Sequence, residues 1–60
     1  MNLEVGKTYY FELYEGKGFK AKVTEIRYNK FYLDNDESID FENIKRAIEI
    51  YQFNYETNIF

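Results

Sequence analysis

Short runs of alternating apolar and polar residues, separated by turn residues, make up most of the chain. Over residues 7–14, Tyr9, Phe11 and Leu13 fall on one face of an extended segment. Residues 15–18 then contain two glycines, which adopt positive φ without a steric penalty. This pattern predicts a first strand that ends in a hairpin turn.

Residues 19–28 predict a second, longer strand. Apolar residues take every second position up to Val23, and the apolar positions then change parity at Ile26 and Tyr28. A change of parity within one strand indicates a β-bulge, here near residues 24–25. The bulge should bend the strand so that it contributes to two sides of a barrel.

The rest of the chain up to residue 51 predicts three more strands. We expect a tight turn at 29–30, a third strand over 31–34, a turn over 35–37, a fourth strand over 38–41, one helical turn over 42–44 and a fifth strand over 45–51. Ile39, Phe41, Ile48 and Ile50 should face the core. A helix over residues 41–50 is the alternative, because some apolar residues there have near-helical spacing. The even spacing of short strands elsewhere favours the strand.

These elements predict an all-β protein with a small five-stranded antiparallel barrel and one helical turn before the last strand. We assign residues 1–51 to the barrel. Residues 52–60 form a C-terminal aromatic tail, which we expect to be extended and to pack on the barrel or on a neighbouring subunit.

Residues 6–50 carry a resemblance to the small barrels of the Sm-like and SH3-like (Src-homology-3-like) type. The matching order is a turn glycine, an apolar residue, a small residue, a valine and a further apolar residue: Gly16, Phe19, Ala21, Val23 and Ile26. The resemblance implies the barrel and assembly into a dimer or ring. The nucleotide-pocket residues of the second Sm motif are absent, so the resemblance does not carry RNA binding over to this chain.

The chain is rich in aromatic residues, with seven Tyr and six Phe. The alternation places Tyr9, Phe11, Phe19, Phe31 and Phe41 in the core. It places Tyr10, Tyr14, Tyr28 and Tyr32 on the outer surface. We expect the remaining four to form a protein interface, since aromatic residues are favoured in interface cores: Tyr51, Phe53, Tyr55 and Phe60.

The parity of the tail supports this interface. Tyr51, Phe53 and Tyr55 alternate with polar residues and have the opposite parity to Ile48 and Ile50. If those two isoleucines face the core, the tail does not simply extend it. The alternative is that the tail folds back and covers its own barrel.

The composition argues against catalysis and cofactor binding. The chain has no His and no Cys, and its only serine, Ser38, has no base near it in sequence. We expect no enzyme activity, no catalytic residue, no cofactor and no metal site. The acidic run between Asp34 and Glu42 lacks the glycine and terminal glutamate of a calcium loop, so we interpret it as a solvated turn.

A basic and aromatic stripe along the second and third strands suggests an alternative function. Its residues are Lys20, Lys22, Arg27, Tyr28 and Tyr32. Such a stripe can bind single-stranded RNA by phosphate contacts and base stacking. The net charge of −3 disfavours a nucleic-acid partner, and the lysines can instead pair with glutamates across the first hairpin.

We therefore expect a non-enzymatic, self-associating binding module that engages a protein partner or a small ligand through its aromatic surface. The start of the chain lacks the features of a signal peptide, and no apolar run approaches the length of a membrane span. These observations favour the cytoplasm and no membrane partner. The abundance of Asn, Ile, Lys, Tyr and Phe is typical of AT-rich coding and suggests a phage or prophage regulator.

Overall fold

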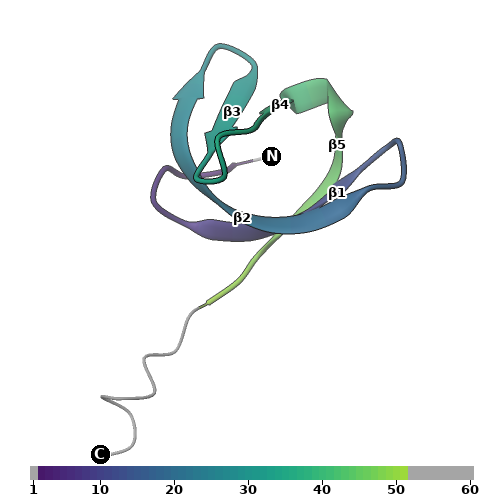
Figure 1. Ribbon diagram of the computed structural model, residues 1–60, viewed down its shortest axis with the longest axis horizontal. Coiled ribbons are helices and arrows are strands. Elements are labelled where there is room, and N and C mark those ends of the chain that lie inside the picture. The colour runs from purple at the N-terminus through teal and green to yellow at the C-terminus, as the bar shows by residue number, and fades with distance from the viewer. Residues whose placement is uncertain (1, 52–60) are drawn as a thin grey trace, which may run out of the picture.

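The computed structural model describes residues 2–51, and these residues form a single curled antiparallel sheet (Figure 1). The elements are β1 (Thr8–Leu13), β2 (Gly18–Arg27), β3 (Lys30–Leu33), β4 (Ser38–Asp40), the 3₁₀ turn η1 (Phe41–Asn43) and β5 (Ile44–Glu49). The predicted fold class is confirmed: all-β, five antiparallel strands and one helical turn before the last. The alternative helix over residues 41–50 is wrong.

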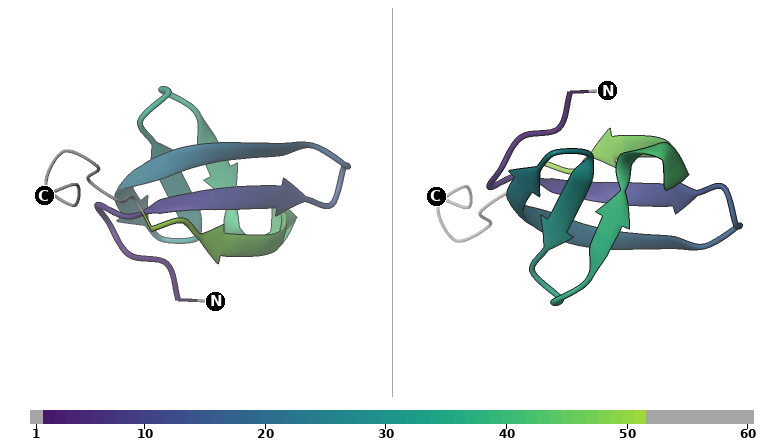
Figure 2. Two further views of the ribbon diagram at one scale, coloured as in Figure 1. Left: turned by 90° about the horizontal axis from the view of Figure 1, so that it is seen from below. Right: turned by 90° about the horizontal axis from the view of Figure 1, so that it is seen from above.

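The sheet curls because β2 is long and is shared by both of its halves. The strand order is β4-β3-β2-β1-β5, and Figures 1 and 2 show β2 curving from its pairing with β1 to its pairing with β3. β4 and β5 are the edge strands of this sheet and do not pair with each other. The curl is therefore not closed by hydrogen bonds, and η1 connects its two edges.

The bend in β2 contains the predicted bulge. Val23 lies opposite Leu33 but Glu25 lies opposite Tyr32, so Thr24 is an extra residue on β2. Beyond this bulge Ile26 lies opposite Phe31, on the inner side of the sheet. The change of apolar parity in the sequence thus identified the bend correctly.

The inner side of the curl holds the core. Its buried residues are Tyr9, Phe11, Ala21, Val23, Phe31, Leu33, Ile39 and Ile44. The ring of Phe11 is fully buried between Tyr9 and Phe19, with ring centroids 5.9 and 5.8 Å away. The hydroxyl oxygen of Tyr9 accepts a hydrogen bond from the backbone N–H of Glu4 at 2.9 Å, which satisfies its only polar atom.

The prediction that Ile48 faces the core is wrong. Glu12 lies opposite Arg46 while Leu13 lies opposite Ile44, so Lys45 is an extra residue on β5. This second bulge reverses the parity of the strand, and Ile48 pairs with Tyr10 on the outer face with 46% of its surface exposed. Nothing in the sequence of β5 marks the bulge, because a single lysine is also the ordinary polar residue of an alternating strand.

Three details of the turns also differ from the prediction. Of the two glycines in the first hairpin only Gly16 has positive φ (98°), whereas Gly18 belongs to β2. The second hairpin turns at residues 28–29 rather than 29–30. Phe41 begins η1 instead of ending the fourth strand, and 42% of its surface is exposed. Within residues 2–51 no helix is long and apolar enough to cross a membrane.

Candidate binding surfaces

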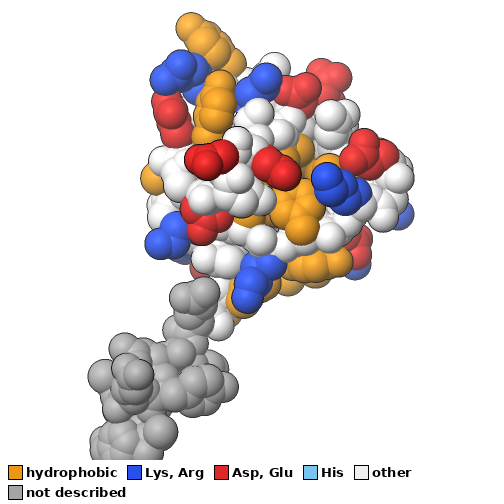
Figure 3. All heavy atoms as spheres, in the orientation of Figure 1, with side chains coloured by type: hydrophobic (Ala, Val, Ile, Leu, Met, Phe, Trp, Pro, Cys, Tyr) orange, Lys and Arg blue, Asp and Glu red, His pale blue; other side chains and the backbone are white. Residues whose placement is uncertain are grey.

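The aromatic side chain with the highest exposed fraction among the described residues lies at the tip of the β2–β3 hairpin. Tyr28 is 95% exposed and has φ of +56°. Large side chains rarely adopt this region, because Cβ approaches the following carbonyl oxygen. The turn therefore holds a bulky ring in solvent in a backbone conformation that asparagine or glycine adopts more easily. In Figure 3 hydrophobic side chains reach the upper margin of the molecule over this hairpin.

Two further apolar side chains lie beside this tip. Ile26 is on the inner side of the sheet but at its open end, with 38% of its surface exposed, and Phe41 is 42% exposed. Together with Tyr28 they line a hollow of about 260 Å³ whose other walls include Leu3 and Phe31. We call Ile26, Tyr28 and Phe41 the apolar end. It is an extension of the core that no described part of the chain covers.

The apolar end is held rigidly. The backbone N–H of Phe41 donates a hydrogen bond to the carbonyl oxygen of Asn29 at 2.6 Å, which ties η1 to the β2–β3 turn. The rings of Phe31 and Phe41 lie 6.3 Å apart, within the range of a favourable aromatic pair. These contacts fix Phe41 and the backbone of the turn, while the side chain of Tyr28 stays exposed to solvent.

The predicted basic stripe is divided into two parts by the bulge at Thr24. Lys20 and Lys22 lie on the outer face of the first half of β2, opposite Tyr10 and Thr8. The remaining three residues lie on the second hairpin, after the strand has bent. The five side chains therefore do not form one continuous surface.

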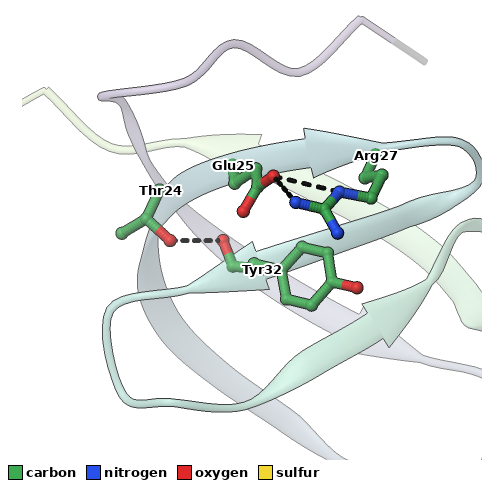
Figure 4. Close-up of polar contacts among 4 residues, drawn as sticks. All are labelled: Thr24, Glu25, Arg27 and Tyr32. Atoms are coloured by element: carbon green, nitrogen blue, oxygen red, sulfur yellow. Dashed lines mark hydrogen bonds and ion pairs between the residues drawn. The ribbon is translucent and has the colours of Figure 1, made fainter.

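On the second hairpin the charge of Arg27 is already compensated. Its guanidinium donates two hydrogen bonds to the carboxylate of Glu25, at 2.6 and 3.1 Å, and lies 5.9 Å from the ring centre of Tyr32 (Figure 4). The hydroxyl of Thr24 donates to the carbonyl oxygen of Tyr32 at 3.2 Å. Arg27 and Tyr32 are thus engaged with neighbours, while Tyr28 alone is free to contact a partner.

Only the first part of the acidic run, residues 34–37, forms the turn between β3 and β4, whereas Asp40 ends β4 and Glu42 lies in η1. Asp36 has φ of +67°, and the side-chain oxygen of Asn35 accepts a hydrogen bond from the backbone N–H of Glu37 at 3.0 Å. Both features are typical of Asn and Asp in turns. No group of acidic side chains within residues 2–51 is arranged to hold a metal ion.

One titrating group lies in a cluster of charges near the start of β1. The ammonium of Lys7 is 3.4 Å from the carboxylate of Glu4 and 3.5 Å from that of Glu49. The negative charge of Glu4, and after it that of Glu49, raises the pKa of Lys7. The cluster is exposed to solvent, so its ion pairs contribute little to stability.

Most of the proposed tail interface lies outside the described residues. Phe53, Tyr55 and Phe60 belong to that part of the chain, and Tyr51 is the last described residue, with 78% of its surface exposed. The outward position of Ile48 changes the parity argument, because positions 47 and 49 now face inward. In sequence, positions 51, 53 and 55 have the parity of positions 47 and 49, whereas position 60 does not.

The search for similar proteins gives no match. No family model, no curated protein and no solved structure matches the chain.

Proposed function

We propose that this chain is a non-enzymatic binding module that self-associates and engages a protein partner through the apolar end. The observation that carries the proposal is the fully exposed ring of Tyr28, held at positive φ beside Ile26 and Phe41. A strained backbone around an exposed aromatic side chain is typical of positions kept for contact rather than for stability. Aromatic side chains with few rotatable bonds dominate the energetics of protein interfaces.

We also propose that the module is a small barrel of the SH3-like or Sm-like type. The strand order, the bulge that bends β2 and the 3₁₀ turn before β5 support this assignment. Small barrels of this kind present loops and strand ends at the rim of a stable core. The apolar end lies at such a rim.

Partner binding is best tested by selecting ligands against the intact chain. Peptides displayed on phage would be selected for binding to the wild type and then measured against Tyr28→Ala. We expect apolar peptides that lose at least about tenfold in affinity, the loss of a typical interface tyrosine. Tyr14→Ala is the matched control, since Tyr14 is 69% exposed but does not line the hollow. Equal losses for the two variants would contradict the proposal.

Self-association is tested separately, through the tail. Tyr51, Phe53, Tyr55 and Phe60 form the proposed interface between copies. Light scattering should give a dimer or a larger species for the whole chain and a monomer for a chain that ends at Tyr51. A monomer in both cases would remove self-association from the proposal and leave partner binding standing.

RNA binding through Lys20, Lys22, Arg27, Tyr28 and Tyr32 remains the alternative function. It requires that RNA bridge the two parts into which the bulge divides the stripe. Labelled single-stranded RNA should then lose affinity steeply with salt, and equally when either part is altered. No binding at low salt would exclude this alternative.

A further inference from the structure

The basic side chains of the described residues fall into two equal groups. Four of the eight form ion pairs with carboxylates: Lys7, Arg27, Lys30 and Arg46. The other four have no ion pair with any carboxylate among residues 2–51: Lys17, Lys20, Lys22 and Lys45. Three of these four unpaired lysines lie together on one region of the surface.

Three of the four unpaired lysines, Lys20, Lys22 and Lys45, lie around Tyr10 on the outer side of the β2–β1–β5 half of the sheet. The ammonium of Lys17 instead lies 5.9 Å from the ring centre of Phe19, which packs against the core on the inner side. Lys20 is directly opposite Tyr10 across the β1–β2 ladder, and Lys22 is the next outward residue of β2. Lys17 and Lys45 line a hollow of about 240 Å³ together with Tyr10. The left view of Figure 2 shows β2, β1 and β5 side by side in front of the rest of the sheet.

The centre of this region is apolar. Tyr10 is 38% exposed and its direct neighbour on β5 is Ile48, which is 46% exposed. A Cβ atom at Gly18 would collide with the hydroxyl of Tyr10 and lie 3.1 Å from its ring carbon Cζ. The absence of a side chain at Gly18 thus lets the tyrosine ring extend over β2. We call Tyr10 and Ile48 with Lys20, Lys22 and Lys45 the basic face.

The one acidic side chain that lines the same hollow does not neutralise the lysines. The carboxylate of Glu12 accepts a hydrogen bond from the guanidinium of Arg46 at 3.1 Å. That pair cancels its own charge, and among residues 2–51 no carboxylate forms an ion pair with the lysines of this face. Asp34 lies near Lys22, where it accepts a hydrogen bond from the backbone N–H at 3.2 Å, yet it forms no ion pair with the ammonium.

We propose that the basic face docks an acidic protein segment in which a large apolar side chain is flanked by carboxylates. The apolar side chain packs on Tyr10 and Ile48, and the carboxylates on either side of it meet the lysines at the edges of the face. Charge complementarity of this kind steers association and fixes the register of the partner. The site is separate from the apolar end, so it does not depend on the function proposed above.

The composition of the basic face favours protein over nucleic acid. Ile48 offers an aliphatic surface, which packs against an apolar side chain but gives a base no ring to stack on. The face also has only one aromatic residue, whereas single-stranded nucleic acid is bound by several stacking platforms. A chain of net charge −3 repels a polyanion with a charge on every residue more strongly than a short acidic segment.

The test is a titration of the ¹⁵N-labelled full chain with the synthetic peptide EDELFEDE, followed by amide chemical shifts. We expect the shifts to concentrate at Tyr10, Lys20 and Ile48, with none at Tyr28 or Phe41. The amide-containing peptide QNQLFQNQ should bind at least about tenfold more weakly, because it keeps the apolar centre but lacks the charges. Raising the salt from about 50 to about 500 mM should weaken binding of the acidic peptide alone.

Charge variants of the protein complete the test. Lys20→Glu combined with Lys22→Glu should reduce the affinity for EDELFEDE at least about tenfold. The milder pair Lys20→Gln and Lys22→Gln should act in the same direction, which covers the case in which the reversal unfolds the chain. Arg27→Glu is the matched control, because it changes charge on the other half of the sheet, and it should have little effect.

Two outcomes would overturn the proposal. One is that millimolar EDELFEDE causes no shifts on the basic face, or shifts the apolar end equally. The other is that an oligothymidylate of eight nucleotides shifts the same residues at lower concentration than the peptide, which would make the face a nucleic-acid site.

Discussion

Replacing Tyr28 by asparagine should stabilise the protein while removing a contact residue. The side chain of Tyr28 is 95% exposed, so its loss removes almost no buried surface. Its φ of +56° lies in the left-handed region, which costs an ordinary residue about 1–2 kcal/mol and asparagine much less. Part of that cost is recovered, and we expect the free energy of unfolding to rise by about 0.5–1 kcal/mol.

The effect is large enough to measure in a chain of this size. For a domain of about 60 residues, 1 kcal/mol shifts the melting temperature by about 4–8 °C. Tyr28→Asn should therefore melt about 2–8 °C higher than the wild type. Thermal unfolding followed by circular dichroism, with urea unfolding as a second measurement, gives the free energy directly.

Two control variants separate the strained backbone from the exposed ring. Tyr28→Ala removes the ring but keeps an ordinary residue at positive φ, so its stability should stay within about 0.5 kcal/mol of the wild type. Tyr14→Asn makes the same chemical change at a position that is exposed but has no positive φ, and it should give no gain. Tyr28→Asn and Tyr28→Ala should both bind the peptides selected against the wild type more weakly than the wild type does.

A result in which Tyr28→Asn is no more stable than the wild type would refute this reasoning. It would mean that the ring packs on something in solution or that the turn relaxes to negative φ. A gain in stability together with a loss of binding would instead show that this turn keeps a residue that the fold does not need.

Three further results test the outer face and the charge cluster. Gly18→Ala should raise the free energy of unfolding by about 0.5–1 kcal/mol in a Tyr10→Ala background and by less in the wild type, where the hydroxyl of Tyr10 must move. Equal gains in the two backgrounds would contradict the close approach of the Tyr10 ring to Gly18. Ile48→Thr should cost less than about 0.5 kcal/mol in urea unfolding, since the side chain faces solvent, and a loss above about 1 kcal/mol would indicate a buried residue. The negative charge of Glu4, more than any other group, raises the pKa of Lys7 in the folded state. The stabilisation by the ion pairs of Lys7 is therefore fully present below the unfolded-state pKa near 10.5 and is lost as the pH rises through the folded-state pKa. The urea midpoints of wild type and Lys7→Met should converge at high pH.

The fold class followed from the sequence because alternation, glycine and turn residues agree over most of the chain. The first strand, the long second strand and its bulge at Thr24 were all predicted, since the parity of apolar residues changes visibly between Val23 and Ile26. The second bulge could not be predicted. Lys45 is polar whether it is an ordinary outward residue or an inserted one, so its effect on Ile48 appears only when the register with β1 is known.

The candidate surfaces were predicted less well than the fold. Tyr28 was assigned to the surface correctly, but its neighbours Ile26 and Phe41 were expected inside. Alternation reports on which side of a sheet a residue lies, and Ile26 does lie on the inner side. Alternation does not report whether anything covers that side, which depends on where the sheet remains open.

Both surfaces have their origin in the way a short chain curls its sheet. The bulge at Thr24 bends β2 far enough to enclose a core, but β4 and β5 do not pair, and Ile26 and Phe41 remain partly exposed at one end of the core. The bulge at Lys45 turns Ile48 outward beside Tyr10 and places a lysine at the rim of the same face. Bulges recur next to functional sites because they redirect side chains without changing the strand order. The irregular residues of this sheet thus account for both its curvature and the apolar groups that it exposes on its surface.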